Sequence, residues 1–297
     1  MSPLGLMRWQ GGWRDYMNVI RLPGLLVLSL LGACGLFDSE NAIMTPDQQM
    51  AAFIAHEQKT NGPSQGLRTS TNDVKAKAGI FASLGTAYLQ DDHPRQAVRE
   101  LRVAIHADQN YANAYNVMGL AYEQLGQNPL ARKAFEQALS LDGKNPEFRN
   151  NYGAFLLNRR DYQAAIIQLQ QATADPLYST PQFAWTNLAI AYAGLKDLAA
   201  ARNALNRALN LVPDYPPALQ MLAEMDFKAG NVDAAYGHLQ VILAQEPNNP
   251  SALLLAGQLA ARQGRHQHAA SLWQRCVISA PYSAAGKQAQ QLLLQQD

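Results

Sequence analysis

A pair of neighbouring residues recurs along the chain at an almost constant interval, and this interval limits the possible folds more than any other feature. The spacings between successive pairs are 34, 34, 36, 34 and 34 residues. The pairs are Leu84-Gly85, Met118-Gly119, Tyr152-Gly153, Leu188-Ala189, Leu222-Ala223 and Ala256-Gly257. A period of this length is typical of arrays in which each unit buries its apolar face only by stacking on its neighbours. The sequence therefore predicts six stacked units over residues 78–281.

Further positions follow each pair at fixed offsets and indicate two helices per unit. A large residue follows on the first helix at Tyr88, Tyr122, Leu156 and Tyr192. The second helix carries a small residue at Ala97, Ala131, Ala165, Ala201, Ala235 and Ala269. Four residues later it carries a large one at Leu101, Phe135, Leu169, Leu205, Leu239 and Trp273. Residues four apart share a helical face, so each large residue should cross the small residue of the first helix.

These positions resemble the tetratricopeptide repeat, whose period is 34 residues. The resemblance predicts an all-α fold, a right-handed superhelical solenoid of six tetratricopeptide (TPR) helix-turn-helix repeats. The segment 282–297 has Ala285, Ala289, Leu292 and Leu293 on one side and glutamine on much of the rest. It is expected to form a C-terminal capping helix that covers the last repeat.

The N-terminal residues have the order of a secretory signal. Arg21 precedes an apolar run over residues 25–31, which is too short to cross a membrane, and small residues then lead to Cys34. The tetrapeptide Leu31-Gly32-Ala33-Cys34 resembles the lipobox of bacterial lipoproteins. We therefore expect residues 1–33 to be a lipoprotein signal peptide and Cys34 to be acylated and to anchor the chain in a membrane. An ordinary buried cysteine is the alternative, and Met1, Met7 and Met17 are all candidate starts.

Residues 34–77 differ from the repeats in composition and are expected to form the lipidated N-terminus and a flexible tether. A short helix is predicted over residues 46–57, with Pro46 in its first turn. The following stretch is polar and has linker composition. Asp91 and Asp92, further along, precede the second helix of the first repeat and are expected to cap it.

Charge and motifs argue against several classes of function. Without residues 1–33 the basic and acidic residues nearly balance, so no basic face is available for nucleic acid. The phosphate-binding, metalloprotease and hydrolase motifs are missing, which predicts that the chain is not an enzyme and has no cofactor or small-molecule substrate. His266 and His268 lie two apart, a spacing that places them on different sides of a helix and does not suit a metal. Cys276 is expected to pack in the core.

The first helices should line the concave face, where a partner would bind. The expected groove consists of apolar residues and amides, namely Asn116, Leu120, Asn150, Ala154, Leu157, Phe183, Thr186 and Ile190. Such a lining suits a peptide or helix with apolar anchors. The alternative is that the apolar members only support the neighbouring repeat, and Leu157 lies close to that boundary. Gln220 and Glu224 make the fifth repeat more polar.

The third repeat contains residues that a generic repeat does not require. Asn150-Asn151-Tyr152-Gly153 is followed by Phe155-Leu156, and Asp175-Pro176-Leu177-Tyr178 brings two extra residues before the fourth repeat. This combination resembles the type IV pilus biogenesis and stability lipoproteins, the PilF/PilW pilotin family. The resemblance implies an outer-membrane lipoprotein on the periplasmic face that binds the pilus secretin subunit, a PilQ-like protein. It further implies promotion of secretin localisation and multimerisation, pilus biogenesis and twitching motility. A general periplasmic TPR adaptor that docks cell-wall enzymes is the alternative.

Overall fold

The computed structural model describes residues 71–295, which form helices and contain no strand. The predicted signal peptide, Cys34 and most of the tether lie outside these residues. The chain divides into two units, 63–247 and a second unit that includes 248–297, and each is described by itself. None of the helices between residues 71 and 295 combines the length and apolarity that a membrane span requires.

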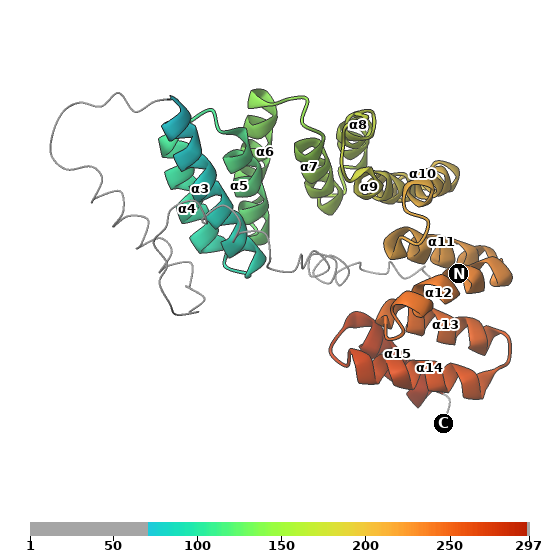
Figure 1. The fold of residues 1–297 in the computed structure, drawn as a ribbon. Helices are drawn as coiled ribbons and strands as arrows, with labels where there is room; N and C mark the ends of the chain where they lie inside the picture. The colour runs from blue at the N-terminus through green and yellow to red at the C-terminus, as the bar shows by residue number, and fades with distance from the viewer. Residues whose placement is uncertain (1–70, 296–297) are drawn as a thin grey trace, which may run out of the picture. The chain divides into compact units, whose positions relative to one another are not determined.

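The first unit contains five helix pairs that follow one another in chain order (Figure 1). The pairs are α3 (Thr71–Gln90) and α4 (Pro94–Ala107), α5 (Ala112–Gln124) and α6 (Asn128–Leu141), α7 (Pro146–Asn158) and α8 (Tyr162–Thr173), α9 (Pro181–Gly194) and α10 (Leu198–Leu211), and α11 (Pro216–Ala229) and α12 (Val232–Gln245). Helix α3 thus begins before residue 78, where the repeats were expected to start.

The second unit contains the sixth pair, α13 (Pro250–Arg262) and α14 (His266–Ser279), followed by α15 (Ala284–Leu294). Helix α15 packs against both other helices, and Ala289 is its fully buried residue. The Ser283 side chain caps α15 by accepting from the Gly286 N–H at 3.0 Å.

Local sequence explains where the helices start and stop. Proline stands in the first turn of α4, α6, α7, α9, α11 and α13, where its missing N–H costs nothing. Asn145 caps α7 by accepting from the Glu147 and Phe148 N–H groups. The expected cap of α4 is wrong, because His93 holds the cap position without a side-chain bond. Asp92 instead adopts a φ of 62° in the turn, and its Oδ1 accepts from the Gln124 side chain of the next repeat.

The predicted crossing of small and large residues is present in the repeats. A Cβ built on Gly85 would lie 2.7 Å from Leu101 Cγ, and one built on Gly119 would lie 2.7 Å from Phe135 Cδ1. On Gly153 it would lie 2.6 Å from Leu169 Cγ. These distances are shorter than carbon atoms tolerate, so glycine allows the second helix to approach the first. In the second unit Gly257 faces Trp273 in the same way.

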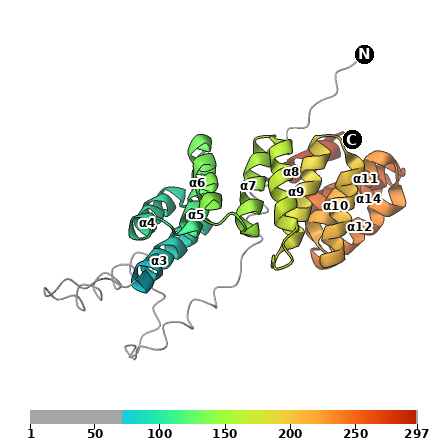
Figure 2. The ribbon, with the colours of Figure 1, turned by 90° about the horizontal axis from the view of Figure 1, so that it is seen from above.

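The contacts of the first unit show which helices lie on its inner side. The first helices of successive repeats touch, α3 with α5, α5 with α7, and α7 with α9. The second helices, α4, α6, α8 and α10, make no comparable contact with one another. Neighbouring elements are closest on the inside of a curved stack, so the first helices line the concave face. Figure 2 shows α7, α8 and α9 side by side in this stack.

Candidate functional site

The two neighbouring asparagines of α7 connect three repeats along the concave face. Asn151 Nδ2 donates to Asn116 Oδ1 in the second repeat at 3.2 Å. Asn187 Nδ2 in the fourth repeat donates to Asn150 Oδ1 at 3.0 Å. The repeat spacing could not reveal a role for Asn151, and the structure shows it bound to the preceding first helix. Together these bonds form an amide ladder from α5 through α7 to α9.

An aromatic cluster lies where α7 meets the preceding second helix, α6. The ring of Phe135 lies 5.7 Å from that of Tyr152 and 5.5 Å from that of Phe155, which is 1% exposed. Arg132 lies over the Phe155 ring at 5.8 Å and donates to the Tyr152 hydroxyl at 3.1 Å. Burial, followed by the hydrogen bond to Glu136, raises the pKa of the Tyr152 phenol. Phe155 is therefore a packing residue between the second and third repeats.

The two-residue insertion between α8 and α9 forms an ordered turn. The Leu177 N–H donates to Asp175 Oδ1 at 2.8 Å, and the Tyr178 N–H donates to the Asp175 carbonyl oxygen at 3.3 Å. The side chain of Tyr178 is buried in the core of the third and fourth repeats, whereas Leu177 is 90% exposed. The insertion thus anchors one apolar side chain and presents the other to solvent.

The eight residues of the predicted groove separate into two groups. The half-buried members, whose side chains a partner can reach, are Leu120, Asn150, Ala154, Phe183 and Ile190. The buried members are Asn116, Leu157 and Thr186.

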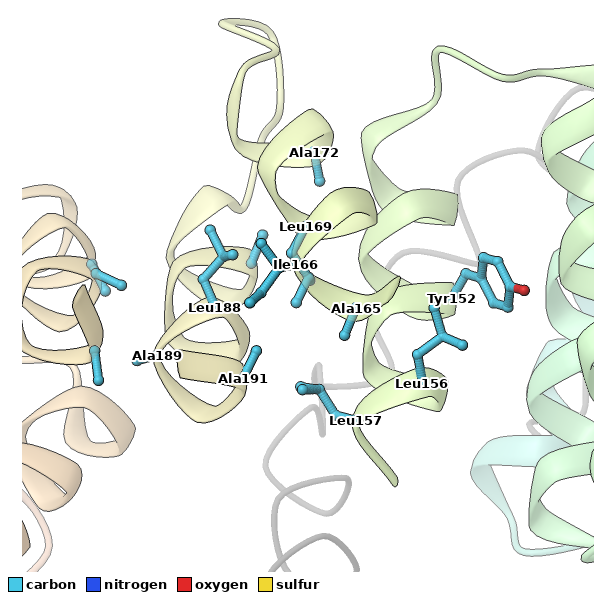
Figure 3. Close-up of a cluster of buried hydrophobic side chains, with 14 of the residues drawn as sticks. Tyr152, Leu156, Leu157, Ala165, Ile166, Leu169, Ala172, Leu188, Ala189 and Ala191 are labelled. Atoms are coloured by element: carbon cyan, nitrogen blue, oxygen red, sulfur yellow. The ribbon is translucent and has the colours of Figure 1, made fainter. Parts of the chain in front are cut away.

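Each buried member has an internal role. Asn116 belongs to the amide ladder, and Thr186 Oγ1 donates to the Gln182 carbonyl oxygen of its own helix at 2.8 Å. Leu157 is 5% exposed and points toward the neighbouring helices in the core close-up (Figure 3). The accessible concave surface is therefore narrower than the predicted one.

A buried ionic cluster joins the fourth and fifth repeats, and no sequence pattern pointed to it. Asp226 on α11 is 2% exposed, and its Oδ1 accepts from Arg202 on α10 at 2.7 Å. Asn231 donates to the same oxygen at 3.2 Å, and His238 Nε2 lies 3.4 Å from Oδ2. Burial alone would raise the pKa of Asp226, but these hydrogen bonds and the charges of Arg202 and His238 together lower it.

The described residues offer little for metal or thiol chemistry. Between residues 71 and 295 no three His, Cys, Asp or Glu side chains gather to hold a metal ion. Cys276 is fully buried in the second unit, its Sγ lies 3.2 Å from the Pro250 carbonyl oxygen, and burial raises its pKa to about 11. A thiol with this pKa stays protonated at neutral pH and is a poor nucleophile.

Family models agree with the repeat geometry. One model of the tetratricopeptide repeat matches residues 116–179 and 221–284, and a second matches residues 182–225, so together they span more than half of the chain. The chain belongs to the tetratricopeptide repeat proteins. The predicted all-α TPR superhelix is confirmed, as is the prediction that this scaffold protein is not an enzyme.

Among tetratricopeptide repeat proteins, the chain closely resembles two type IV pilus factors. It is 27% identical to the type IV pilus assembly protein PilF of Pseudomonas aeruginosa over 68% of this chain and 79% of that protein. The crystal structure of PilW, a widely conserved type IV pilus biogenesis factor, matches with a TM-score of 0.64 and 29% identity over 71% of this chain and 97% of PilW. The structure of Pseudomonas aeruginosa PilF matches with a TM-score of 0.65 and 25% identity over 73% of this chain and 98% of that one.

Proposed function

We propose that this protein is a pilotin, a lipoprotein that binds the secretin subunit of the type IV pilus and brings it to the outer membrane to multimerise. The observation that carries the proposal is its similarity to PilF and PilW, which spans nearly all of the solved chains of both. PilF is named as a type IV pilus assembly protein and PilW as a type IV pilus biogenesis factor. A secretin partner is the further step that we propose for this chain.

The concave face supports the binding half of this proposal. Leu120 and Ile190 are half-buried on α5 and α9 and pack against the core while leaving part of each side chain accessible. Asn150 lies between them on α7, and its position is fixed by the bond from Asn187. Apolar side chains around a positioned amide suit a segment that offers apolar anchors and backbone hydrogen bonds.

The anchoring half rests on Cys34, whose lipobox-like context lies outside the described residues. Two or three acyl chains hold a protein on a membrane stably, whereas one does not. In this proposal residues 34–77 let the repeats reach the secretin in the periplasm while the lipid directs the complex to the outer membrane.

Deletion of the gene tests the proposal as a whole. We expect loss of twitching and of detergent-resistant secretin multimers in the outer membrane, with restoration by the wild-type chain. A Cys34→Ser chain should fold and still bind the secretin but should not restore outer-membrane multimers. Normal multimers in the deletion strain would reject the pilotin proposal and leave the cell-wall adaptor as the alternative.

Substitutions on the concave face test the binding surface separately. Leu120→Asp and Ile190→Asp should each reduce co-purification of the secretin, because a desolvated carboxylate opposes an apolar anchor. Gln137→Asp, an exposed change on the second helix α6, is the matched control. Circular dichroism should show equal helicity in all three. Secretin recovery that is unchanged by both concave substitutions would exclude this surface.

A further inference from the structure

The first helix of the fifth repeat, α11, has a polar pair that differs from the amides of the ladder. Gln220 Nε2 donates to Glu224 Oε1, one turn further along, at 3.0 Å. Gln220 is 8% exposed, and its Oε1 is buried without a hydrogen-bond donor among the described residues. Leaving a buried carbonyl oxygen unsatisfied costs free energy, so this arrangement calls for an explanation.

The register of the repeats places this pair on the concave face. Gln220 is the counterpart of Asn116, Asn150 and Thr186 in the preceding repeats. The oxygens of Asn116 and Asn150 accept from the next repeat, and the Thr186 hydroxyl donates within its own helix. Of these four positions, Gln220 is the one that has a buried oxygen without a donor. The packing of each first helix on the next first helix also ends at α9, because α9 and α11 make no contact comparable to that of α7 and α9.

The chemistry of the pair selects a particular class of ligand. Glu224 is half-buried, and no ion pair of the described residues includes it. The nearby Asp226 is different, since Arg202 and His238 already surround it. Gln220 and Glu224 therefore offer oxygens that accept hydrogen bonds and one negative charge that no cation balances. A lysine ammonium or an arginine guanidinium has several N–H donors and the complementary charge.

An aromatic pair lies near the start of the same helix. The rings of Phe183 on α9 and Tyr215, at the N-cap position of α11, meet edge to face at 5.9 Å and 85°. Both residues are half-buried, so part of each residue remains accessible to solvent. An aliphatic side chain next to the cation would pack on this surface.

We propose that Gln220 and Glu224 bind a lysine or arginine side chain of a partner protein, and that Phe183 and Tyr215 receive the apolar residue beside it. On binding, the Gln220–Glu224 bond opens, the amide oxygen turns toward the ligand, and both oxygens accept from the cation. This inference rests on the proposed function only in using the concave face for binding. It adds the chemistry of the segment that this face selects.

Selection from a random-peptide display library on the full-length chain tests the proposal without the secretin. We expect selected peptides to share a lysine or arginine beside an apolar residue, and Glu224→Gln to weaken one such peptide about tenfold. Asp233→Asn on α12, an exposed carboxylate, is the matched control and should leave its affinity unchanged. The same peptide with norleucine in place of lysine should bind the wild-type and Glu224→Gln chains equally.

Several results would overturn the inference. Selected peptides without basic residues, no selected peptides, or equal losses of peptide affinity from Glu224→Gln and Asp233→Asn would each reject it.

The Gln220→Leu substitution provides a second test, because it removes the unsatisfied oxygen. A higher melting temperature together with weaker binding of the lysine peptide supports the proposal, whereas a higher melting temperature with unchanged binding makes Gln220 only a structural residue. Normal secretin multimers in the deletion strain would reject the pilotin function and leave these binding results intact.

Discussion

Replacing Gly153 by alanine adds a single carbon at the point where α7 and α8 are closest. The new Cβ would lie 2.6 Å from Leu169 Cγ and 2.7 Å from Leu169 Cδ2. Leu169 is fully buried, so a shift of its side chain would disturb the core residues packed around it. We therefore expect Gly153→Ala to destabilise the protein although alanine is the better helix former.

The magnitude follows from two opposing contributions. Overpacking a core costs about 1–3 kcal/mol. Alanine in place of glycine within a helix gains about 0.5–1 kcal/mol. The free energy of unfolding should therefore fall by up to about 2.5 kcal/mol, with a central value of about 1 kcal/mol. A Leu169→Ala chain lacks the atoms that the new Cβ would overlap. In that background Gly153→Ala should raise the free energy of unfolding by about 0.5–1 kcal/mol.

Chemical denaturation followed by circular dichroism measures these differences from the shift of the unfolding midpoint. Gly237 on α12 is the matched control, because a Cβ there would meet nothing within 4 Å. Gly237→Ala should stabilise the chain by about 0.5–1 kcal/mol in the wild-type background. If Gly153→Ala stabilises the wild-type chain as Gly237→Ala does, α7 and α8 do not approach each other as closely as the reasoning requires.

Three further predictions concern other contacts. Phe155→Ala should lower the free energy of unfolding by about 3–5 kcal/mol, because the ring is fully packed at the junction of the second and third repeats, and thermal melts would show a large shift. Arg202→Met should cost about 1.5–3 kcal/mol at pH 7, because it removes the main partner of the buried Asp226 carboxylate while Asn231 and His238 remain. Because the folded pKa of Asp226 is lowered, the stability that it contributes is present above its unfolded pKa and is lost as the pH falls through the folded value, so the wild-type and Arg202→Met melting temperatures should converge in acid. Cys276 should react with a thiol reagent at pH 8 only after denaturation, since burial holds its pKa near 11, and rapid labelling of the native chain would contradict this.

The period and the small-to-large pairing predicted the helix pairs because they are local rules of packing. Gly119 and Phe135 are joined by steric exclusion, and that relation is visible in the sequence as a fixed offset. The insertion at residues 175–178 was likewise visible as two extra residues before the fourth repeat. Its consequence, a buried Tyr178 and an exposed Leu177, required the turn itself.

The contacts between repeats could not be predicted in the same way, because they depend on how far each repeat rotates on the next. Asn151 and Asn150 are adjacent in the chain but bond to opposite neighbours. Arg202 and Asp226 belong to different repeats, and no repeated spacing marks them. The accessible part of the concave face was overestimated for a related reason, since the burial of Leu157 depends on the helices that pack beside it.

The amide ladder also has a mechanical consequence. The ladder joins α5, α7 and α9 on the concave face through the Asn151–Asn116 and Asn187–Asn150 hydrogen bonds. These hydrogen bonds must break before the helices can move apart on that face. Among the described residues the amide ladder does not continue from α9 to α11, where the Phe183–Tyr215 ring contact joins the two helices and the Arg202–Asp226 pair joins α10 to α11. We therefore expect the curvature of the first unit to change less between its second and fourth repeats than at its fifth repeat. A bound segment could then alter the curvature at the fifth repeat while the third keeps its form.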